Sequence, residues 1–247
     1  KIVRPSFIIL NVKTLSVLIP VFNEEKTVIE SISRVIDTEI FDEVIIVDDC
    51  SSDNSYKIIK NFIFDDKRLK LLKTSKNIGK GGAVNFGKKY INSDFVVIHD
   101  ADLEYFPNDL RSLFEKADSE TMIIGSRFIG NLKRHNKYKS TYFANKILSK
   151  LFSLIYKVNI TDIATCYKLM PTKYFKNTNF KSAGFEYEIE VVAKFLKYSN
   201  KIIEVPINYE GRSYKEGKKI KAFDGVKYIF AMILYRYESH ISNNSDL

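Results

Sequence analysis

Residues 15–49 read "LSVLIPVFNEEKTVIESISRVIDTEIFDEVIIVDD", and this stretch decides the fold. An apolar run at 15–19 closes at Pro20, as a strand buried in a parallel sheet does. Residues 23–37 then place apolar side chains at helical spacing, and a second apolar run at 43–49 ends in two aspartates. Strand, helix and strand in this order predict two parallel strands joined by a helix.

The same alternation continues along the first half of the chain. We expect helices at 52–66, 77–91 and 108–117, and strands at 69–73, 94–100 and 121–126. This pattern predicts an α/β fold with a mostly parallel central sheet and helices on both faces. Ligands bind such sheets beyond the carboxyl ends of the strands, where polar residues gather in this sequence.

The second half is less regular. We expect helices at 142–157, 184–199 and 224–238 and a strand at 201–210. The sequence has no internal repeat or low-complexity linker. We therefore interpret the second half as an elaboration of one domain rather than as a separable unit.

Three carboxylates, Asp100, Asp102 and Glu104, follow the fourth predicted strand at alternate positions. Alternate residues of a strand point to the same side. Two carboxylates about 4 Å apart repel by roughly 4 kcal/mol at an effective dielectric constant near 20. No basic residue lies between His99 and Pro107, which favours a divalent cation, although a distant lysine could serve instead. Oxygen ligands of this kind suit Mg²⁺ or Mn²⁺.

The net charge of +9 is unevenly distributed. Residues 1–126 carry 17 Lys and Arg against 20 Asp and Glu, whereas residues 127–247 carry 22 against 10. This asymmetry predicts that the second half faces an anionic partner, namely nucleic acid, a phosphorylated ligand or a membrane surface. A solvated lysine-rich face is the alternative.

The composition is that of a soluble globular protein, with 45% hydrophobic and 28% charged residues. Two cysteines, Cys50 and Cys166, cannot form a disulfide framework, and they form no zinc pattern with histidines. The apolar run at 228–235 is far shorter than the roughly 20 residues of a membrane span. The first residues lack the apolar core and cleavage site of a signal peptide. We therefore expect a cytoplasmic protein.

Five motifs of the first half occur in a characteristic order, namely "LSVLIPVFNEEKTV", "IIVDDCSSDNS", "NIGKGGAVNFG", "VIHDADLEY" and "IIGSRF". Their order and spacing resemble those of family 2 glycosyltransferases with the GT-A (Rossmann-like) fold. The later segments "TDIATCYKLM", "GFEYEIEVVAKF" and "VPINYEGRSYKEGKKIKAFDGVKYI" look like the dolichyl-phosphate mannose/glucose synthase branch, which glycosylates polyprenyl phosphates.

The resemblance covers residues 14–238 and implies a single GT-A domain over that range. Within it, residues 14–126 would bind the nucleotide sugar, and residues 127–238 would form the acceptor half. Residues 1–13 would be an N-terminal extension and residues 239–247 a tail.

The resemblance also implies roles for single residues. Asp100, Asp102 and Glu104 would hold Mg²⁺ or Mn²⁺, although Glu104 stands where the branch commonly has glutamine. The nucleotide sugar would contact strand ends and a glycine-rich turn, namely Pro20, Val21, Asn23, Glu24, Asp49, Gly79, Gly82, Asp100, Ala101 and Asp102. For the glycines of this turn, a plain turn without ligand contact is the alternative.

The implied reaction is inverting transfer of a hexose from a nucleotide-diphosphate sugar (GDP-mannose or UDP-glucose type) to a polyprenyl (dolichyl or undecaprenyl) phosphate. The implied catalytic residues are Asp100, Asp102, Arg127, Asp162 and Glu186. The residues expected to bind the acceptor phosphate are Arg127, Arg212, Lys218 and Lys219. Cys166 stands where the branch has glycine.

A glycan hydroxyl is the alternative acceptor, and it would need a general base such as Asp162, Glu186 or Glu188. An inactive sugar-nucleotide-binding protein is a third possibility. A nucleic-acid-binding module is disfavoured because acids at the strand ends repel phosphates. A nucleotidyltransferase is disfavoured because the sequence shows no early glycine-rich triphosphate loop.

A lipid acceptor implies association with a membrane. The helices expected at 142–157 and 224–238 combine apolar residues with lysine or arginine, a pattern typical of interfacial helices. Packing of these helices against the sheet is the alternative. We expect a peripheral protein at the cytoplasmic face of an anionic membrane.

Overall fold

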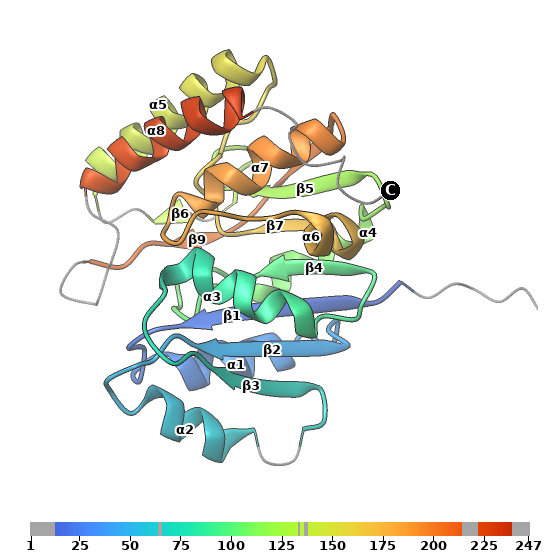
Figure 1. The fold of residues 1–247 in the computed structure, drawn as a ribbon, viewed down its shortest axis with the longest axis vertical. Coiled ribbons are helices and arrows are strands. Elements are labelled where there is room, and N and C mark those ends of the chain that lie inside the picture. The colour runs from blue at the N-terminus through green and yellow to red at the C-terminus, as the bar shows by residue number, and fades with distance from the viewer. Residues whose placement is uncertain (1–12, 64–65, 133, 136–137, 214–221, 239–247) are drawn as a thin grey trace, which may run out of the picture.

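The computed structural model describes residues 13–63, 66–132, 134–135, 138–213 and 222–238. Its centre is a seven-stranded sheet in the order β3-β2-β1-β4-β7-β5-β8 (Figure 1). The strands are β1 (Leu15–Val21), β2 (Glu43–Asp48), β3 (Leu69–Lys73), β4 (Phe95–Ile98), β5 (Thr121–Ser126), β7 (Lys168–Pro171) and β8 (Lys201–Pro206). Neighbouring strands are parallel except where β7 pairs with β4 and β5. The predicted α/β fold with a mostly parallel sheet is confirmed.

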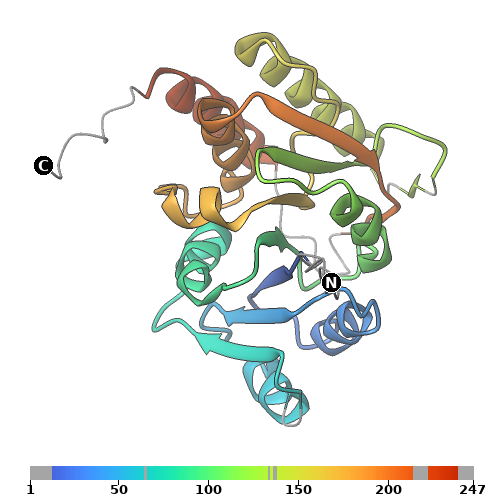
Figure 2. The ribbon, with the colours of Figure 1, turned by 90° about the vertical axis from the view of Figure 1, so that its right-hand side faces the viewer.

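Helices cover both faces of the sheet. One face carries α1 and α4, and the other carries α3, α6 and α7 (Figure 2). Their bounds are α1 (Val28–Ile36), α2 (Ser55–Phe62), α3 (Gly79–Gly87), α4 (Leu110–Glu115), α6 (Thr172–Asn177) and α7 (Tyr187–Tyr198), with 3₁₀ turns η1 (Lys88–Tyr90) and η2 (Pro107–Asp109). Apolar side chains of β1, β2, β4 and β5 are buried between the two helical layers, and this burial stabilises the domain.

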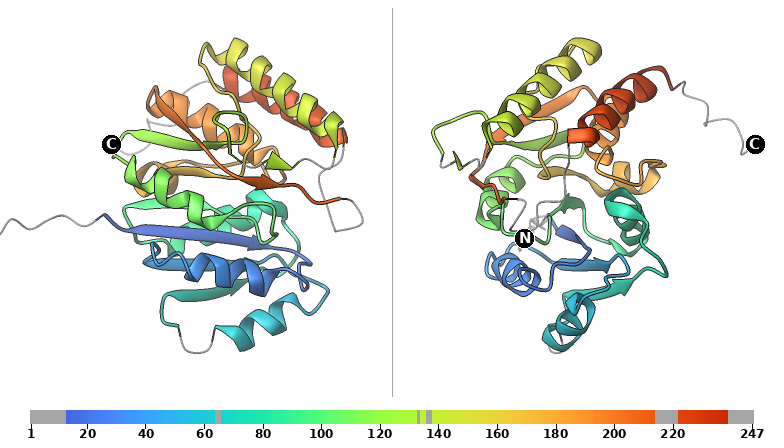
Figure 3. Two further views of the ribbon diagram at one scale, coloured as in Figure 1. Left: turned by 180° about the vertical axis from the view of Figure 1, so that it is seen from behind. Right: turned by 90° about the vertical axis from the view of Figure 1, so that its left-hand side faces the viewer.

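Two long helices, α5 (Lys139–Tyr156) and α8 (Ala222–Tyr237), lie side by side beyond α7 (Figures 1 and 3). The Tyr156 hydroxyl donates a hydrogen bond to the Met232 carbonyl at 2.9 Å, which ties the two helices together. Among the described residues, none of the helices has the length and hydrophobicity that a membrane span requires.

β1 continues two residues beyond the predicted strand, through Pro20 to Val21. Proline has no backbone N–H and is normally excluded from a central strand. It is tolerated here because β4 ends at Ile98 and pairs with β1 only as far as Leu18. Pro20 therefore has a paired strand on one side alone, opposite Val47 of β2.

Two parts of the second half differ from the expectation. β7, which lies antiparallel between β4 and β5, has only four residues, too few for a periodic pattern. The strand expected at 201–210 divides into β8 and the short β9 (Tyr209–Glu210). β9 pairs with β6 (Arg134–His135) in a separate two-stranded sheet.

His99 connects β4 to the helical layer. Its ring nitrogens lie 3.0 Å from the Ser31 hydroxyl of α1 and 3.0 Å from the Tyr167 hydroxyl. The residue is almost fully buried, and burial lowers the pKa of the imidazole to about 4. The folded protein therefore holds this histidine neutral at physiological pH.

The variant His99→Gln should change how stability depends on pH. A group whose folded pKa is about 4 and whose unfolded pKa is 6.5 loses its stabilising contribution as the pH falls from 6.5 to 4. That contribution is about 3 kcal/mol. We expect the wild type to lose about this much stability relative to the variant across that window. Urea unfolding of both proteins in chelator at pH 7, 6, 5 and 4 measures the difference, and parallel curves would contradict the buried neutral state.

Candidate active site

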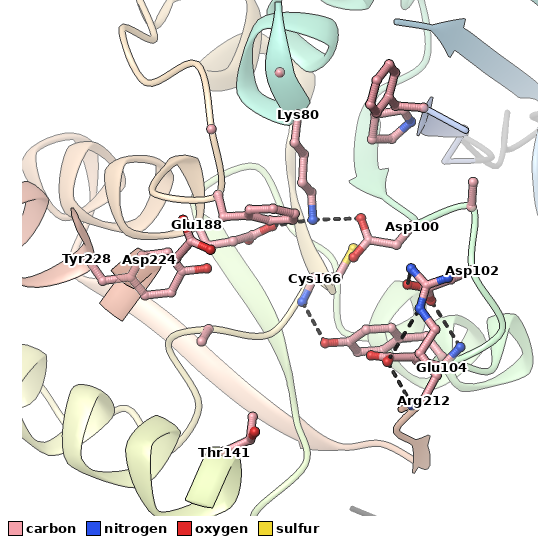
Figure 4. Close-up of a pocket in the computed structure, with 18 of the residues that line it drawn as sticks. Lys80, Asp100, Asp102, Glu104, Thr141, Cys166, Glu188, Arg212, Asp224 and Tyr228 are labelled. Atoms are coloured by element: carbon pink, nitrogen blue, oxygen red, sulfur yellow. Dashed lines mark hydrogen bonds and ion pairs between the residues drawn. The ribbon is translucent and has the colours of Figure 1, made fainter. Parts of the chain in front are cut away.

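A cavity of about 700 Å³ lies at the carboxyl ends of β1, β2, β4 and β5 (Figure 4). Strand ends and the start of α3 contribute Pro20, Asp49, Lys80 and Asp100 to one side. The N-terminal parts of α5 and α8 supply the opposite side, including Ser140, Thr141, Ala144, Asp224 and Tyr228. The cavity therefore reaches from the edge of the sheet to the α5–α8 pair.

Asp100 belongs to a chain of buried ion pairs. Lys80 of α3 lies 2.6 Å from Asp100 and 2.8 Å from Glu188, and the other oxygen of Glu188 lies 2.6 Å from Lys168. Burial opposes ionisation of Asp100, but the Lys80 ammonium outweighs it and lowers the pKa of this carboxyl. Asp100 in turn raises the pKa of Lys80, although burial alone would lower it. Asp100 is thus held as a carboxylate.

Asp102 and Glu104 belong to a different cluster, because the chain bends after Asp100 and no longer alternates as a strand does. The Arg212 guanidinium lies 3.0 Å from Asp102 and 2.9 Å from Glu24. Glu104 accepts hydrogen bonds from the backbone N–H of Arg212 at 2.9 Å and from the Tyr209 hydroxyl at 2.7 Å. Burial, Glu104 and Asp100 together raise the pKa of Asp102 to about 7.

The sequence favoured a divalent cation as the partner of these acids and left a distant lysine open as the alternative. The structure supplies such a lysine and also an arginine, and the metal site stays a prediction. Lys80 and Arg212, which are distant in sequence, already pair with Asp100 and Asp102. Among the described residues, no group of three or more His, Cys, Asp or Glu side chains has the arrangement of a metal site. The donors at Asp102 and Glu104 nevertheless fit Mg²⁺ or Mn²⁺ chemically, since they are hard oxygens in a cluster short of positive charge.

The Asp49 carboxylate accepts hydrogen bonds from the glycine-rich turn and so fixes the conformation of this turn. Its oxygens accept hydrogen bonds from the N–H groups of Ile78 and Gly79, at 2.9 and 2.7 Å, and from the Thr74 hydroxyl. An anion at this position also stabilises the N-terminus of α3. Asp49 also lines the cavity, so a ligand bound there would contact this turn.

The glycines of the turn allow a close backbone approach. A Cβ on Gly79, whose φ is +78°, would lie 2.4 Å from the Ala183 carbonyl oxygen, and one on Gly81 would lie 2.2 Å from that of Ser182. The Gly82 N–H donates to the Ala183 carbonyl at 3.2 Å. The absence of side chains at these glycines therefore lets α3 pack against the segment before α7. Of the three glycines, only Gly79 lines the cavity.

Arg127 and Asp162 form a buried bidentate pair. The guanidinium Nε and Nη2 lie 2.7 and 2.8 Å from the two Asp162 oxygens. The backbone N–H of Arg127 donates to the same carboxylate at 3.0 Å. The guanidinium also lies over the Tyr209 ring, 4.8 Å from its centroid. Arg127 lines the cavity, whereas Asp162 is fully buried and does not. Asp162 thus holds the Arg127 guanidinium in place, and its role as a general base stays a prediction.

The other predicted residues divide according to whether they reach the cavity. Val21, Glu24 and Ala101 line it with those already described, but Asn23, Gly82 and Glu186 do not. Asn23 binds Ser52 through its side chain, and Glu186 accepts a hydrogen bond from the Gly184 N–H at 3.1 Å. Lys218 and Lys219 lie outside the described residues. Sequence reasoning missed Lys80, Lys168 and Tyr209, because their partners are distant along the chain.

Replacing Asp162 with asparagine should destabilise the protein by about 3–5 kcal/mol, because it leaves the buried Arg127 charge without a counterion. The matched control is Asp66→Asn, which breaks the bidentate pair between Asp66 and Arg68 at the surface. That pair is worth about 1 kcal/mol or less. Denaturant unfolding of both variants makes the comparison, and equal losses would rule out a special role for the buried pair.

The sheet order, with its cavity at the strand ends, is that of the GT-A fold. The sequence model described as Glycosyl transferase family 2 matches residues 16–178, and the chain belongs to this family. The resemblance inferred from the motifs is thus confirmed.

Related proteins support the same branch at low identity. The chain is 27% identical to dolichol-phosphate mannosyltransferase of Pyrococcus furiosus over 237 residues, which cover 90% of this chain and 64% of that protein. It is 26% identical to UDP-N-acetylglucosamine–dolichyl-phosphate N-acetylglucosaminyltransferase of Methanococcus voltae, covering 91% and 96%. An uncharacterized protein of Methanocaldococcus jannaschii, MJ0544, is 28% identical, covering 86% and 98%.

Among solved structures, the fold is similar to that of glucosyl-3-phosphoglycerate synthase from Mycobacterium tuberculosis in complex with Mn²⁺, UDP-glucose and phosphoglyceric acid. The TM-score is 0.69 at 16% sequence identity, and the match covers 91% of this chain and 79% of that chain. At this identity the likeness concerns the fold alone.

Proposed function

We propose that the protein is an inverting glycosyltransferase that moves a hexose from a GDP- or UDP-linked sugar to a polyprenyl phosphate. One observation carries this proposal: a single cavity joins the acids at the strand ends to the N-terminal parts of α5 and α8. The nucleotide sugar would occupy the sheet end, where the family motifs lie. The lipid phosphate would enter at the end formed by the two helices.

The surface of the α5–α8 pair supports a lipid acceptor. Large apolar side chains are exposed on both helices, namely Phe143, Ile147, Leu154, Val226, Ile229, Phe230, Ile233, Leu234 and Tyr237. Tyr228 and Met232 of α8 are buried instead, so α8 both packs on the protein and presents an apolar side to the exterior. Clusters of this kind mark interaction sites, and lysines between them suit an anionic membrane.

The partners of the carboxylates also favour a phosphate acceptor. A hydroxyl acceptor needs a carboxylate that is available as a base, whereas a phosphate is already an anionic nucleophile. Each described carboxylate of the cavity has a partner: Glu24, Asp102 and Glu104 contact Arg212, Asp100 and Glu188 contact Lys80, Asp49 accepts backbone N–H groups, and Asp224 lies near Lys227. Arg127 and Lys227 also line the cavity, and they pair with Asp162 and Asp224.

Mg²⁺ or Mn²⁺ would be held by Asp102 and Glu104, next to Asp100. When bound, the cation would neutralise negative charge on the departing nucleoside diphosphate. Lys80 would keep Asp100 ionised and oriented beside it, and the Asp49-bonded turn would border the nucleotide. Arg127, oriented by Asp162, would position the acceptor phosphate through a charge-assisted hydrogen bond.

The transfer assay uses radiolabelled GDP and UDP sugars with Mn²⁺ and either dolichyl or undecaprenyl phosphate. We expect label in the lipid fraction, and a loss of about 10²–10³-fold in kcat for Asp102→Asn, since a transition-state interaction is removed. Asp66→Asn, at a half-buried acid that does not line the cavity, is the matched control and should retain activity. Incorporation only into a soluble glycan or a small phosphorylated acceptor would refute the lipid acceptor.

Membrane association should depend on the exposed apolar side chains of α5 and α8. The double variant Ile147→Asp, Phe230→Asp changes two side chains that are each 67% exposed, and it should abolish flotation with anionic liposomes. Phe62→Asp, an exposed position on α2 at the opposite end of the molecule, should float like the wild type (Figure 1). Equal flotation of all three proteins would contradict the assignment of this surface.

A further inference from the structure

Arg212 occupies the centre of an acidic cluster formed by Glu24, Asp102 and Glu104 (Figure 4). Its Nη1 and Nη2 lie 3.0 and 2.9 Å from the two oxygens of Glu24, and Nη2 lies 3.0 Å from Asp102. The side chain is only 14% exposed. Its Nε has no hydrogen-bond partner and lies 3.7 Å from Glu104. The guanidinium thus serves three carboxylates at once, with one of its donors unsatisfied.

This cluster gathers three carboxylates around one guanidinium. Among the described residues, Arg212 is the cation within 4 Å of Glu24, Asp102 and Glu104, and all three share it in a nearly buried place. The neighbouring chain of Asp100, Lys80, Glu188 and Lys168 has two acids and two lysines and is neutral. A buried cluster with excess charge is costly unless a counterion completes it. A divalent cation at Asp102 and Glu104 would supply positive charge of this kind.

We propose that the Arg212 guanidinium occupies the position of the divalent cation in the free protein. It contacts the acidic cluster when no ion is bound, and it must release Asp102 when the ion binds. The inference rests on the cation requirement in the proposed function. It assigns Arg212 to the cation site as a positioning residue and not to the acceptor phosphate. A guanidinium and a divalent cation cannot share the same carboxylate oxygens without strong mutual repulsion.

The backbone around Arg212 permits this exchange. The Glu210 N–H donates to the Glu104 carbonyl at 2.9 Å, a bond that involves none of the cluster's carboxylates. An isolated bridge between Tyr105 and Tyr209 also fastens β9 beside Glu104. The side chain of Arg212 can therefore leave Asp102 while the segment that carries it stays in place. Released from Asp102, the guanidinium would lie beside the cation site, where it could meet the diphosphate of the donor.

The test measures Mn²⁺ affinity without nucleotide at pH 8, from the electron paramagnetic resonance signal of the unbound ion. Arg212→Gln should bind Mn²⁺ about tenfold or more tightly than the wild type, because a competing charge leaves the cluster. Lys227→Gln is the matched control. It removes the same charge from the same cavity at a residue that pairs with Asp224 instead of the cluster, and it should change the affinity less than about threefold.

Arg212→Lys should fall between the wild type and Arg212→Gln, because an ammonium keeps the charge but cannot span three carboxylates. A purely structural role would instead weaken Mn²⁺ binding in Arg212→Gln, with a lower thermal midpoint. That result, equal effects in Arg212→Gln and Lys227→Gln, or no Mn²⁺ binding by any of these proteins would overturn the inference. Tighter binding in Arg212→Gln together with no transfer to polyprenyl phosphate by the wild type would leave the inference intact and refute the proposed acceptor.

Discussion

Cations from distant segments hold Glu24, Asp100, Asp102 and Glu188 in the cavity, and the geometry of the sheet edge depends on these pairs. Arg212 reaches Glu24 across 188 positions of the chain, and Lys80 of α3 reaches both Asp100 and Glu188. A buried charge that loses its partner is strongly destabilising. Each of these pairs therefore forms only when the strand ends, α3 and the segment after β9 are all in their native positions.

These ion pairs place Asp100 and Asp102, which are only two positions apart, in two different environments. Asp100 lies in a chain of ion pairs with two lysines, whereas Asp102 shares one guanidinium with Glu24 and Glu104 among the described residues. The bend after the strand separates two side chains that a regular strand would present together. One carboxylate is thereby kept ionised by lysine, and the other is left with a raised pKa and a need for positive charge.

The cavity links this electrostatic edge to a surface of different chemistry. The helices α5 and α8 line its far end and expose large apolar side chains around Phe143 and Phe230. A polar, acid-lined end suits an activated sugar, and an apolar helix pair suits a lipid chain. In the proposed function, their continuity in one cavity would connect a nucleotide-sugar donor with an acceptor held at a membrane.

The sequence by itself determined the α/β fold, the family and several of the residues that line the cavity, because hydrophobic periodicity and strand-end motifs are local properties of the chain. It did not reveal the four-residue β7, the pair between Arg127 and Asp162, or the partners of Asp100 and Asp102. Only the tertiary structure decided these, because an ion pair depends on where the fold brings distant charges, and no local spacing encodes that distance.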